Sequence, residues 1–469
     1  MNNPPPKQAV STWAAAALVV SNMIGTGVFM SLGWQVATFT DKDGTYMLSG
    51  SVFPYILLWV VGGVLALCGA LCYAELATAL PRSGGEYNFL SRIYHPMMGF
   101  CTGLTSSTIG FAAPIAAAAL VFGDYFFHAF PGLVGVSPYL NASTLAFALV
   151  TLATLAQLRS LRFTGRFQEA ITGLTVLLIL TLIFCGFNAS AAPSVSFVPH
   201  AADMTLPVAA AFGGSLLYVM YAYSGWNAAA YIVGEVNNPA KALPRALIFG
   251  TLFVLVLYVA VNTVFLFTVP TAEYFGKPEV AHIAGTAIFG PIGGRITSCL
   301  ICIGLIAHIS GMMWVGSRVS VAIGTTYPVL GVLSKTSPTQ VPYIALLVQY
   351  AIIFPILFSD PQSIVRYVES ILLFWSLMTV IGVIVLRYRE PNLARPYHTW
   401  GYPVTPLLFA TVTIFCLYQT YTSHPVETLI GTASVLMGIP IYLWASQKVP
   451  EDRQRGVTLP ESSTPSTSL

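Results

Sequence analysis

The residues with the clearest chemical potential lie at two interruptions of long apolar segments. Gly25 and Gly27 are separated by one residue within the apolar segment 10–37, and Gly225 interrupts the apolar segment 207–235. A glycine inside a helix costs about 1 kcal/mol relative to alanine. Residues two positions apart project about 200° apart around a helix, so the first two glycines cannot serve one packing face. The pattern predicts that the helix unwinds locally at both places.

An unwound segment offers backbone groups that can bind a ligand. Unpaired N–H and C=O groups cost several kcal/mol each in hydrocarbon, so they persist only where they line a cavity or bind something. A half-helix that begins near Thr26 presents N–H donors and a positive dipole end, which suit a carboxylate. The carbonyl groups of the two interruptions suit an ammonium group, and a ligand that carries both groups is an α-amino acid. These carbonyls belong to Met23, Ile24, Tyr221, Ala222 and Ser224.

The two interruptions belong to a chain whose composition requires lipid as its solvent. Of its 469 residues, 56% are hydrophobic and 8% are charged, and the mean hydropathy is +0.75. Soluble domains carry about 25% charged residues, and a helix needs about 20 apolar residues to cross a bilayer. A disordered chain, a nucleic-acid-binding protein and a disulfide scaffold are excluded as the overall class. The sequence predicts an all-α membrane protein with twelve transmembrane helices, at residues 10–37, 51–79, 97–123, 144–158, 167–187, 207–235, 246–270, 296–325, 341–358, 367–387, 404–422 and 426–446.

The distribution of cations predicts the orientation of these helices. Lys and Arg near the ends of spans are retained on the cytoplasmic side. If both termini are cytoplasmic, only Lys42, Lys277, Arg295 and Arg366 of the 20 cations lie outside. We therefore predict an integral protein of the plasma or inner membrane with both termini in the cytoplasm.

The two interrupted spans are the first and the sixth, which is the spacing of an inverted repeat. Span 1 runs outward and span 6 runs inward, so the two halves are antiparallel. The predicted organisation is a cytoplasmic N-terminus at 1–9, a first five-helix repeat at 10–188, a second, inverted five-helix repeat at 207–388, spans 11 and 12 at 389–446, and a disordered cytoplasmic tail at 447–469.

Few residues could support enzyme or metal chemistry. The sequence has no HExxH and no GxxxxGK[ST] motif, so a metalloprotease and a P-loop ATPase are excluded. The seven cysteines lie in or beside apolar spans, where a free cysteine behaves as a small hydrophobe. We predict no catalytic residue, no metal site and no enzyme, because no nucleophile, base and orienting group can be placed together. His308 lies deep in a span, where it could serve as a packing residue or as a coupling residue.

The remaining charged residues have two interpretations. Arg366 and Glu369 are three positions apart on one helix face, so they could pair with each other or help to form an outer gate. Glu75 and Glu235 lie at the predicted cytoplasmic ends of their spans, as inner-gate ion pairs or as snorkelling side chains.

Four stretches, in this order along the chain, resemble a known family. They are residues 23–29 (MIGTGVF), 74–87 (AELATALPRSGGEY), 221–239 (YAYSGWNAAAYIVGEVNNP) and 395–406 (RPYHTWGYPVTP). In them the chain is similar to the amino acid-polyamine-organocation superfamily of LeuT-type fold, and within it to the L-amino acid transporter branch. The resemblance implies a LeuT-type 5+5 inverted repeat with broken spans 1 and 6, and secondary active transport by alternating access.

The resemblance also implies roles for single residues. Thr26 and Gly27 would offer N–H groups to the substrate carboxylate, and the carbonyls of Met23, Tyr221 and Ser224 would accept from its amino group. Tyr221 takes the place of the family's gating aromatic, which closes over the substrate from outside.

Two asparagines complete the implied set. Asn227 falls on the family's polar position after Gly-Trp, and Asn22 matches an asparagine of arginine/agmatine exchangers in the same superfamily. The predicted substrate-binding residues are Met23, Ile24, Gly25, Thr26, Gly27, Tyr221, Ala222, Ser224, Gly225 and Asn227. The gating or coupling candidates are Asn22, Tyr223, Thr175, His308 and Ser310.

The coupling ion is left open by a departure from the family pattern. The branch often has a lysine in span 5 near the unwound part of span 1, and here Thr175 stands at that position. No cofactor is expected. Coupling could be substrate exchange, proton symport, or sodium symport through span 1 carbonyls and Ser310.

The polar residues near the interruptions predict the substrate class. We expect no unpaired carboxylate at mid-depth near Gly25 or Gly225, which argues against a cationic side chain, and no central Arg or Lys, which argues against an anionic one. The expected substrate is a neutral L-amino acid, carried by a permease or exchanger in the bilayer. A monomer would be sufficient for this activity. The alternatives are a non-transporting amino-acid receptor or interaction protein and, among transporters, a polyamine or cationic amino acid carrier.

Overall fold

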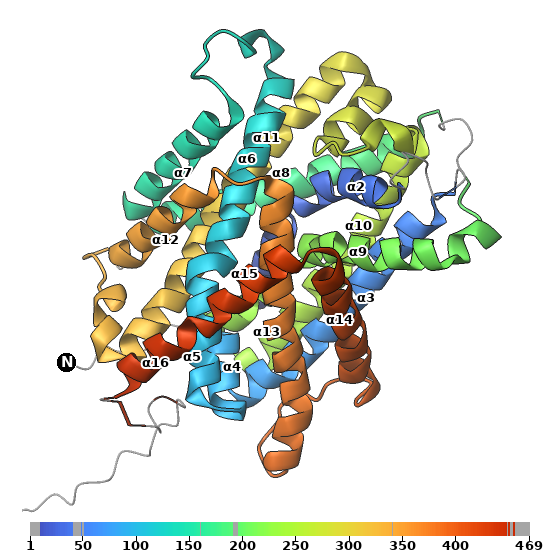
Figure 1. Ribbon diagram of the computed structural model, residues 1–469. Coiled ribbons are helices and arrows are strands. Elements are labelled where there is room, and N and C mark those ends of the chain that lie inside the picture. The colour runs from blue at the N-terminus through green and yellow to red at the C-terminus, as the bar shows by residue number, and fades with distance from the viewer. Residues whose placement is uncertain are drawn as a thin grey trace, which may run out of the picture.

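A computed structural model of the protein describes residues 10–40, 48, 51–159, 161–190, 196–339, 341–447, 449–450 and 454. In these residues the regular structure is helical, apart from two isolated bridges. The helices form one bundle (Figure 1). The predicted N-terminal segment 1–9 and most of the predicted tail 447–469 lie outside the described residues.

Within the described residues, ten helices are long and apolar enough to cross a membrane, which confirms the membrane class. They span Thr12–Thr38, Phe53–Ala79, Pro96–Ala129, Ala142–Arg159, Ala170–Phe187, Pro239–Thr268, Val280–Thr326, Pro361–Arg389, Val404–Ser423 and Pro425–Ser446. The two other predicted spans, 207–235 and 341–358, coincide with α9 (Leu206–Tyr223) followed by the 3-10 helix η4 (Ala228–Glu235), and with α12 (Tyr343–Ile356).

Local chemistry explains where several helices begin. Ser11 caps α1 (Thr12–Met23) by accepting a hydrogen bond from the Ala14 N–H, and Asp360 caps α13 (Pro361–Arg389) through the Ser363 N–H. Proline occupies the first turn where its missing N–H costs nothing. This holds for α3 (Phe53–Ala79), α5 (Pro96–Thr105), α10 (Pro239–Thr268), α13 and α15 (Pro425–Leu436).

Some predicted spans differ in detail from the observed helices. The span predicted at 296–325 belongs to α11 (Val280–Thr326), in which the chain reverses at Gly290 with φ of +78°. The segment before this glycine folds back, so that His282 Nδ1 lies 2.9 Å from Ser298 Oγ. The span predicted at 97–123 is built from α5, a π-helical turn η1 (Ser106–Gly110) and α6 (Phe111–Ala129). The last predicted span is divided into α15 and α16 (Gly438–Ser446).

The interrupted helices lie in the centre of the bundle. α2 (Gly27–Thr38), which continues α1 after the first interruption, packs against α9, and α1 packs against α10 and η4. α13 packs against α9, α6 and α14 (Val404–Ser423), beside α4 (Glu86–Ile93). α7 (Ala142–Arg159) and α12 lie at one side of the bundle, and α8 (Leu161–Phe187) packs against α10 and α11 (Figure 1). The centre of the fold therefore brings the two interruptions together.

Candidate functional site

The first interruption leaves backbone donors unused. α1 ends at Met23, the Gly25 N–H turns back to the Met23 carbonyl at 2.8 Å, and α2 begins at Gly27 with Thr26 as its N-cap. Among the described residues, the N–H groups of Thr26 and Gly27 donate no backbone hydrogen bond. They stand at the positive end of α2, where an anionic group is favoured.

The second interruption requires a glycine. α9 ends at Tyr223, and the Ser224 N–H bonds back to the Tyr221 carbonyl at 3.0 Å. Gly225 then has φ of +94°, and a Cβ at this position would lie 2.8 Å from the Asn22 carbonyl oxygen. A side chain here would be strained by the backbone and would collide with α1.

The two interruptions touch each other. The hydroxyl oxygens of Thr26 and Tyr221 are 3.4 Å apart. A Cβ on Gly27 would lie 2.4 Å from the Cα of Ala222, so the two backbones are in direct contact. Residues that are nearly 200 positions apart in the sequence are thus brought together at the predicted place.

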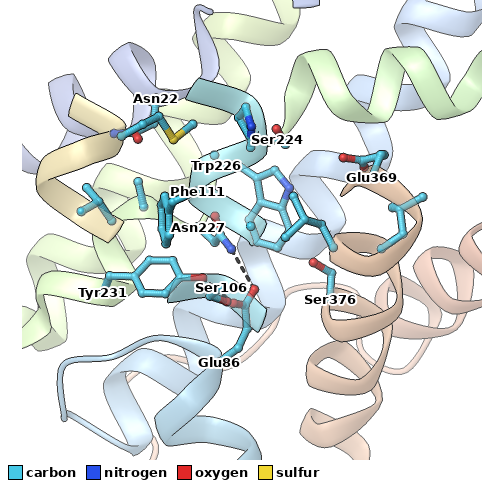
Figure 2. A pocket seen from close by; sticks show the side chains of 18 of the residues that line it. Asn22, Glu86, Ser106, Phe111, Ser224, Trp226, Asn227, Tyr231, Glu369 and Ser376 are labelled. Atoms are coloured by element: carbon cyan, nitrogen blue, oxygen red, sulfur yellow. Dashed lines mark hydrogen bonds between the residues drawn. The ribbon is translucent and has the colours of Figure 1, made fainter. Parts of the chain in front are cut away.

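A cavity lies beside this contact (Figure 2). The space between its lining atoms, open solvent at its mouth included, is about 740 Å³. Four of the predicted residues line it, namely Asn22, Ser224, Gly225 and Asn227. Lining residues that the sequence analysis did not select include Glu86, Ser106, Phe111, Met220, Trp226, Tyr231, Met312, Glu369, Ser376 and Phe409.

Glu86 closes one end of the cavity and is fully hydrogen-bonded. Its carboxylate accepts from the Tyr73 hydroxyl at 2.7 Å, from the Asn227 amide at 2.8 Å, and from the Tyr231 hydroxyl. Burial raises the pKa of this carboxyl, and the three donors act in the opposite direction. Glu86 lies in the SGGEY stretch on which the family resemblance rests, and that was the available signal.

Glu369 corrects one expectation. The sequence predicts no unpaired carboxylate near Gly225, yet Glu369 of α13 lines the same cavity and is only 2% exposed. No hydrogen bond or ion pair to its carboxyl occurs in the described part of the chain, and its Oε2 is fully enclosed. The signal was a single acid inside the apolar segment 367–387, for which a local pair with Arg366 and an outer gate were the two interpretations.

That pair does not form. The Arg366 guanidinium lies 3.2 Å from Glu427 Oε1 and donates to Ser363 Oγ at 2.9 Å and to the Tyr218 hydroxyl at 3.4 Å. The guanidinium points away from Glu369 because α15 supplies the nearer carboxylate.

Some predicted binding groups are occupied by the protein itself. The Met23 carbonyl accepts a hydrogen bond of 2.6 Å from the Tyr258 hydroxyl in addition to that from Gly25. The Tyr223 hydroxyl donates to the Trp59 carbonyl at 2.9 Å and lies outside the cavity. Neither residue presents its polar atom to the cavity in this structure.

The coupling candidates fall in two places. Thr175 and His308 line a second, smaller cavity together with Ile24, behind the first interruption. A Cβ on Gly25 would lie 2.5 Å from the imidazole of His308, so this ring packs directly against the unwound segment. The Ser310 hydroxyl instead accepts a hydrogen bond of 2.9 Å from the Gln157 amide of α7. Ser310 therefore faces α7 and lies outside both cavities.

A buried ion pair joins α3 to α13 and to the segment that follows α13. Arg387 donates two hydrogen bonds to Glu75, at 2.8 and 2.6 Å, and Arg395 lies 3.5 Å from the same carboxylate. The Thr399 N–H also donates to it, at 2.7 Å. Glu75 was interpreted either as a member of an ion pair or as a snorkelling side chain, and the structure shows an ion pair.

These features define an all-helical membrane protein with a cavity where two interrupted helices meet. The family model described as "Amino acid permease" matches residues 10–445, which is most of the chain. The chain belongs to this family, as a member of the amino acid-polyamine-organocation superfamily similar to its L-amino acid transporters, and amino acid transport is its class of activity. The proteins of this class are transporters and not enzymes.

Named relatives cover nearly the whole chain. It is 28% identical over 442 residues to the serine/threonine exchanger SteT of Bacillus subtilis (strain 168), which covers 93% of this chain and 96% of the relative. It is 27% identical to the mouse Asc-type amino acid transporter 1 and 28% identical to the mouse large neutral amino acids transporter small subunit 2, each over 450 residues. Those two alignments cover 93% of this chain and 81% and 80% of the relatives.

Proposed function

We propose that the protein is a secondary transporter of neutral L-amino acids that works by alternating access, with the substrate at the meeting point of the two interrupted helices. The observation that carries the proposal is the contact of Thr26 with Tyr221, and of Gly27 with Ala222, directly beside the cavity. A backbone that is unwound at membrane depth is retained where it binds a ligand.

In this proposal the backbone recognises the parts common to all α-amino acids. The unused N–H groups of Thr26 and Gly27 hold the carboxylate at the N-terminus of α2. The carbonyls of Ile24, Ala222 and Ser224 accept from the ammonium group. Because Tyr258 already binds the Met23 carbonyl, Met23 contributes only when that hydrogen bond opens.

The cavity lining argues against an anionic substrate side chain, whereas the unpaired Glu369 removes the expectation that argued against a cationic one. The described lining contains no Lys or Arg and is dominated by apolar side chains such as Phe111, Trp226 and Met312. The names of the relatives, a serine/threonine exchanger and a large neutral amino acids transporter subunit, point to a neutral substrate.

The proposal includes a LeuT-type arrangement of two inverted five-helix repeats, at 10–188 and 207–388, with both termini in the cytoplasm. It is supported by the interruptions in the first helix of each repeat and by the position of the cations. Tyr221, whose hydroxyl touches Thr26 at the start of α2, would form the closed side of the site.

Flux measurements with the purified chain in liposomes test the function. Liposomes preloaded with unlabelled L-serine or L-leucine are diluted into the same radiolabelled amino acid, and counterflow is followed over time. We expect saturable entry of label above protein-free liposomes. Saturable binding without entry of label would instead support an amino-acid receptor. Competition by lysine or putrescine, with none by neutral amino acids, would support a cationic amino acid or polyamine carrier.

A further inference from the structure

Glu369 is a buried acid without a partner on the wall of the transport cavity. Its side chain is enclosed by α13 and its neighbours, and its carboxyl lies across the cavity from Asn22, on the side of Ser224 (Figure 2). In the described part of the chain nothing donates a hydrogen bond to it. Glu86, the other acid of the same cavity, accepts three hydrogen bonds and so has a structural explanation.

The surroundings supply no compensating positive charge. Arg366, one turn earlier on α13, is committed to Glu427, Ser363 and Tyr218. Among the described cavity residues there is no lysine or arginine. The titratable groups that interact electrostatically with Glu369 are Tyr221 of α9 and Cys416 of α14, and both are uncharged at neutral pH.

The other helices packed against α13 direct their titratable groups elsewhere. The observed partners are Tyr73 with Glu86, Glu75 with Arg387, Arg92 with Glu390, Tyr125 with the Phe29 carbonyl, His128 with Glu279, Glu427 with Arg366, and Tyr367 with Ser434. The charged groups that act on Tyr87 and Asp124 are Arg82 for the first, and Glu279 and His128 for the second. The π-helical turn η1 carries no titratable side chain.

An ionised carboxylate in such a place is costly. Removing a charge from water without a counter-ion or hydrogen bonds is among the most unfavourable changes in a protein, whereas a protonated carboxyl has no net charge to desolvate. A bound zwitterionic amino acid displaces water from the cavity and brings no net positive charge, so the closed, loaded cavity favours the protonated form of Glu369.

We infer that Glu369 is the proton-binding residue that couples amino acid transport to the movement of H⁺. The inference rests on the proposed function and names its coupling ion. Glu369 takes a proton from water on the side to which the cavity is open, carries it neutral through the closed state, and releases it to water on the other side. When the site empties, water refills the cavity and hydrates the ionised carboxylate during the return step, so one proton crosses with each zwitterion and the cycle also carries one positive charge.

The position of Glu369 suits this role. It lines the cavity and is near enough to Tyr221 to interact with it electrostatically. The Tyr221 hydroxyl in turn touches Thr26 at the contact of the two interruptions. A rearrangement that opens this contact would admit water to Glu369 from that side. A rearrangement that keeps the contact closed leaves the carboxyl of Glu369 accessible only from the cavity.

The test uses the purified full chain in liposomes without sodium. In one assay an inward proton gradient of one pH unit is imposed on labelled L-serine or L-leucine uptake, and in a second assay a pH dye inside the liposomes reports proton entry on addition of the unlabelled amino acid. A one-to-one coupling allows accumulation of up to about tenfold at this gradient. We expect wild type to accumulate label, to acidify the lumen with substrate, and to be stimulated by an interior-negative potential.

The variant Glu369→Gln keeps the shape of the side chain and cannot release a proton. We expect it to show counterflow above protein-free liposomes, with no accumulation and no substrate-driven acidification. Glu369→Asp should recover part of both. The matched control is Glu273→Gln, which removes an exposed acid of η5 (Thr271–Tyr274) and should behave as wild type.

The outcomes separate this inference from the proposed function. Wild-type counterflow without accumulation or proton entry overturns the proton coupling and leaves the transporter intact, and this comparison needs no variant to fold. Proton coupling that survives in Glu369→Gln overturns the assignment to Glu369. If lysine or putrescine competes with the labelled amino acid in wild type but not in Glu369→Gln, Glu369 belongs to a subsite for a cationic group and not to a proton site. Absence of any flux in wild type is a failure of the proposed function itself.

Discussion

The hydroxyl oxygen of Thr26 lies 3.4 Å from the hydroxyl oxygen of Tyr221, across the meeting point of the two interrupted helices. Thr26 caps α2, and Tyr221 lies in the last turn of α9. Both side chains are buried. The contact therefore links the N-terminus that would hold a substrate carboxylate to the aromatic side chain that would close the site.

Shortening Tyr221 should remove this closure. We expect Tyr221→Ala to lower saturable uptake at least about tenfold, because the ring whose hydroxyl reaches Thr26 is lost. Tyr221→Phe removes only a long hydroxyl contact, worth roughly 0.5–1.5 kcal/mol, so its loss should be smaller. Initial uptake rates in liposomes, normalised to the amount of folded protein, check the order. Equal uptake by Tyr221→Ala and wild type would contradict the gating role.

The close approach of Gly27 to α9 makes a second prediction. A Cβ at Gly27 would stand 2.4 Å from the Ala222 Cα, and that backbone atom cannot rotate away. Gly27→Ala should therefore separate the two interruptions and reduce uptake at least about tenfold. Gly214→Ala on α9 is the control, since its Cβ would meet only Thr38 Cγ2 at 3.7 Å, an ordinary contact. The site assignment fails if both variants transport equally well.

Gly25 and His308 should show a non-additive effect. A methyl group at Gly25 would collide with the imidazole, 2.5 Å away at its Cε1 atom, so Gly25→Ala should impair transport. Removal of the ring in Gly25→Ala/His308→Ala opens the space, and uptake should recover relative to the single Gly25 variant. Uptake of both single variants and the double variant measures the interaction. Additive losses would show that the imidazole does not press on the unwound segment.

The ion pair of Glu75 should contribute strongly to stability. Glu75→Gln leaves two guanidinium groups without their counter-charge, and its side chain is only 2% exposed. Breaking a buried pair in this way costs about 3–5 kcal/mol. Glu390→Gln breaks the pair with Arg92, whose side chains are 28% and 29% exposed, and should cost at most about 1 kcal/mol. Melting temperatures of the two purified variants test the contrast, which is wrong if the two shifts are equal.

Glu86 should make stability depend on pH. Burial raises its pKa in the folded chain above the ordinary value, so folding takes up a proton between the two pKa values. Its contribution to stability is therefore largest at low pH and declines as the pH rises through the folded pKa. Glu86→Gln lacks this titration, so the melting temperature of wild type minus that of the variant should increase as the pH falls from about 7 to about 4.5. A difference that does not change with pH would contradict the prediction.

The sequence by itself determined the membrane class, most of the helix positions and the two interruptions. These properties are local: lipid forces apolar helices along the chain, and glycine at mid-span weakens a helix wherever that helix packs. The contact of the two interruptions was also predictable, because an inverted repeat places corresponding helices side by side. Gly225 was identified on these grounds, whereas Asn227 and Asn22 were identified through the family resemblance.

Only the tertiary structure decided which polar groups remain free. Tyr258 comes 235 positions after Met23 and takes up its carbonyl, and Gln157 of α7 takes up Ser310. Arg366 prefers Glu427 to the acid on its own helix, which leaves Glu369 alone in the cavity wall. Such pairings depend on which helix faces meet and on distances of a few ångströms between them. The pattern of apolar residues along one helix contains no information about those distances.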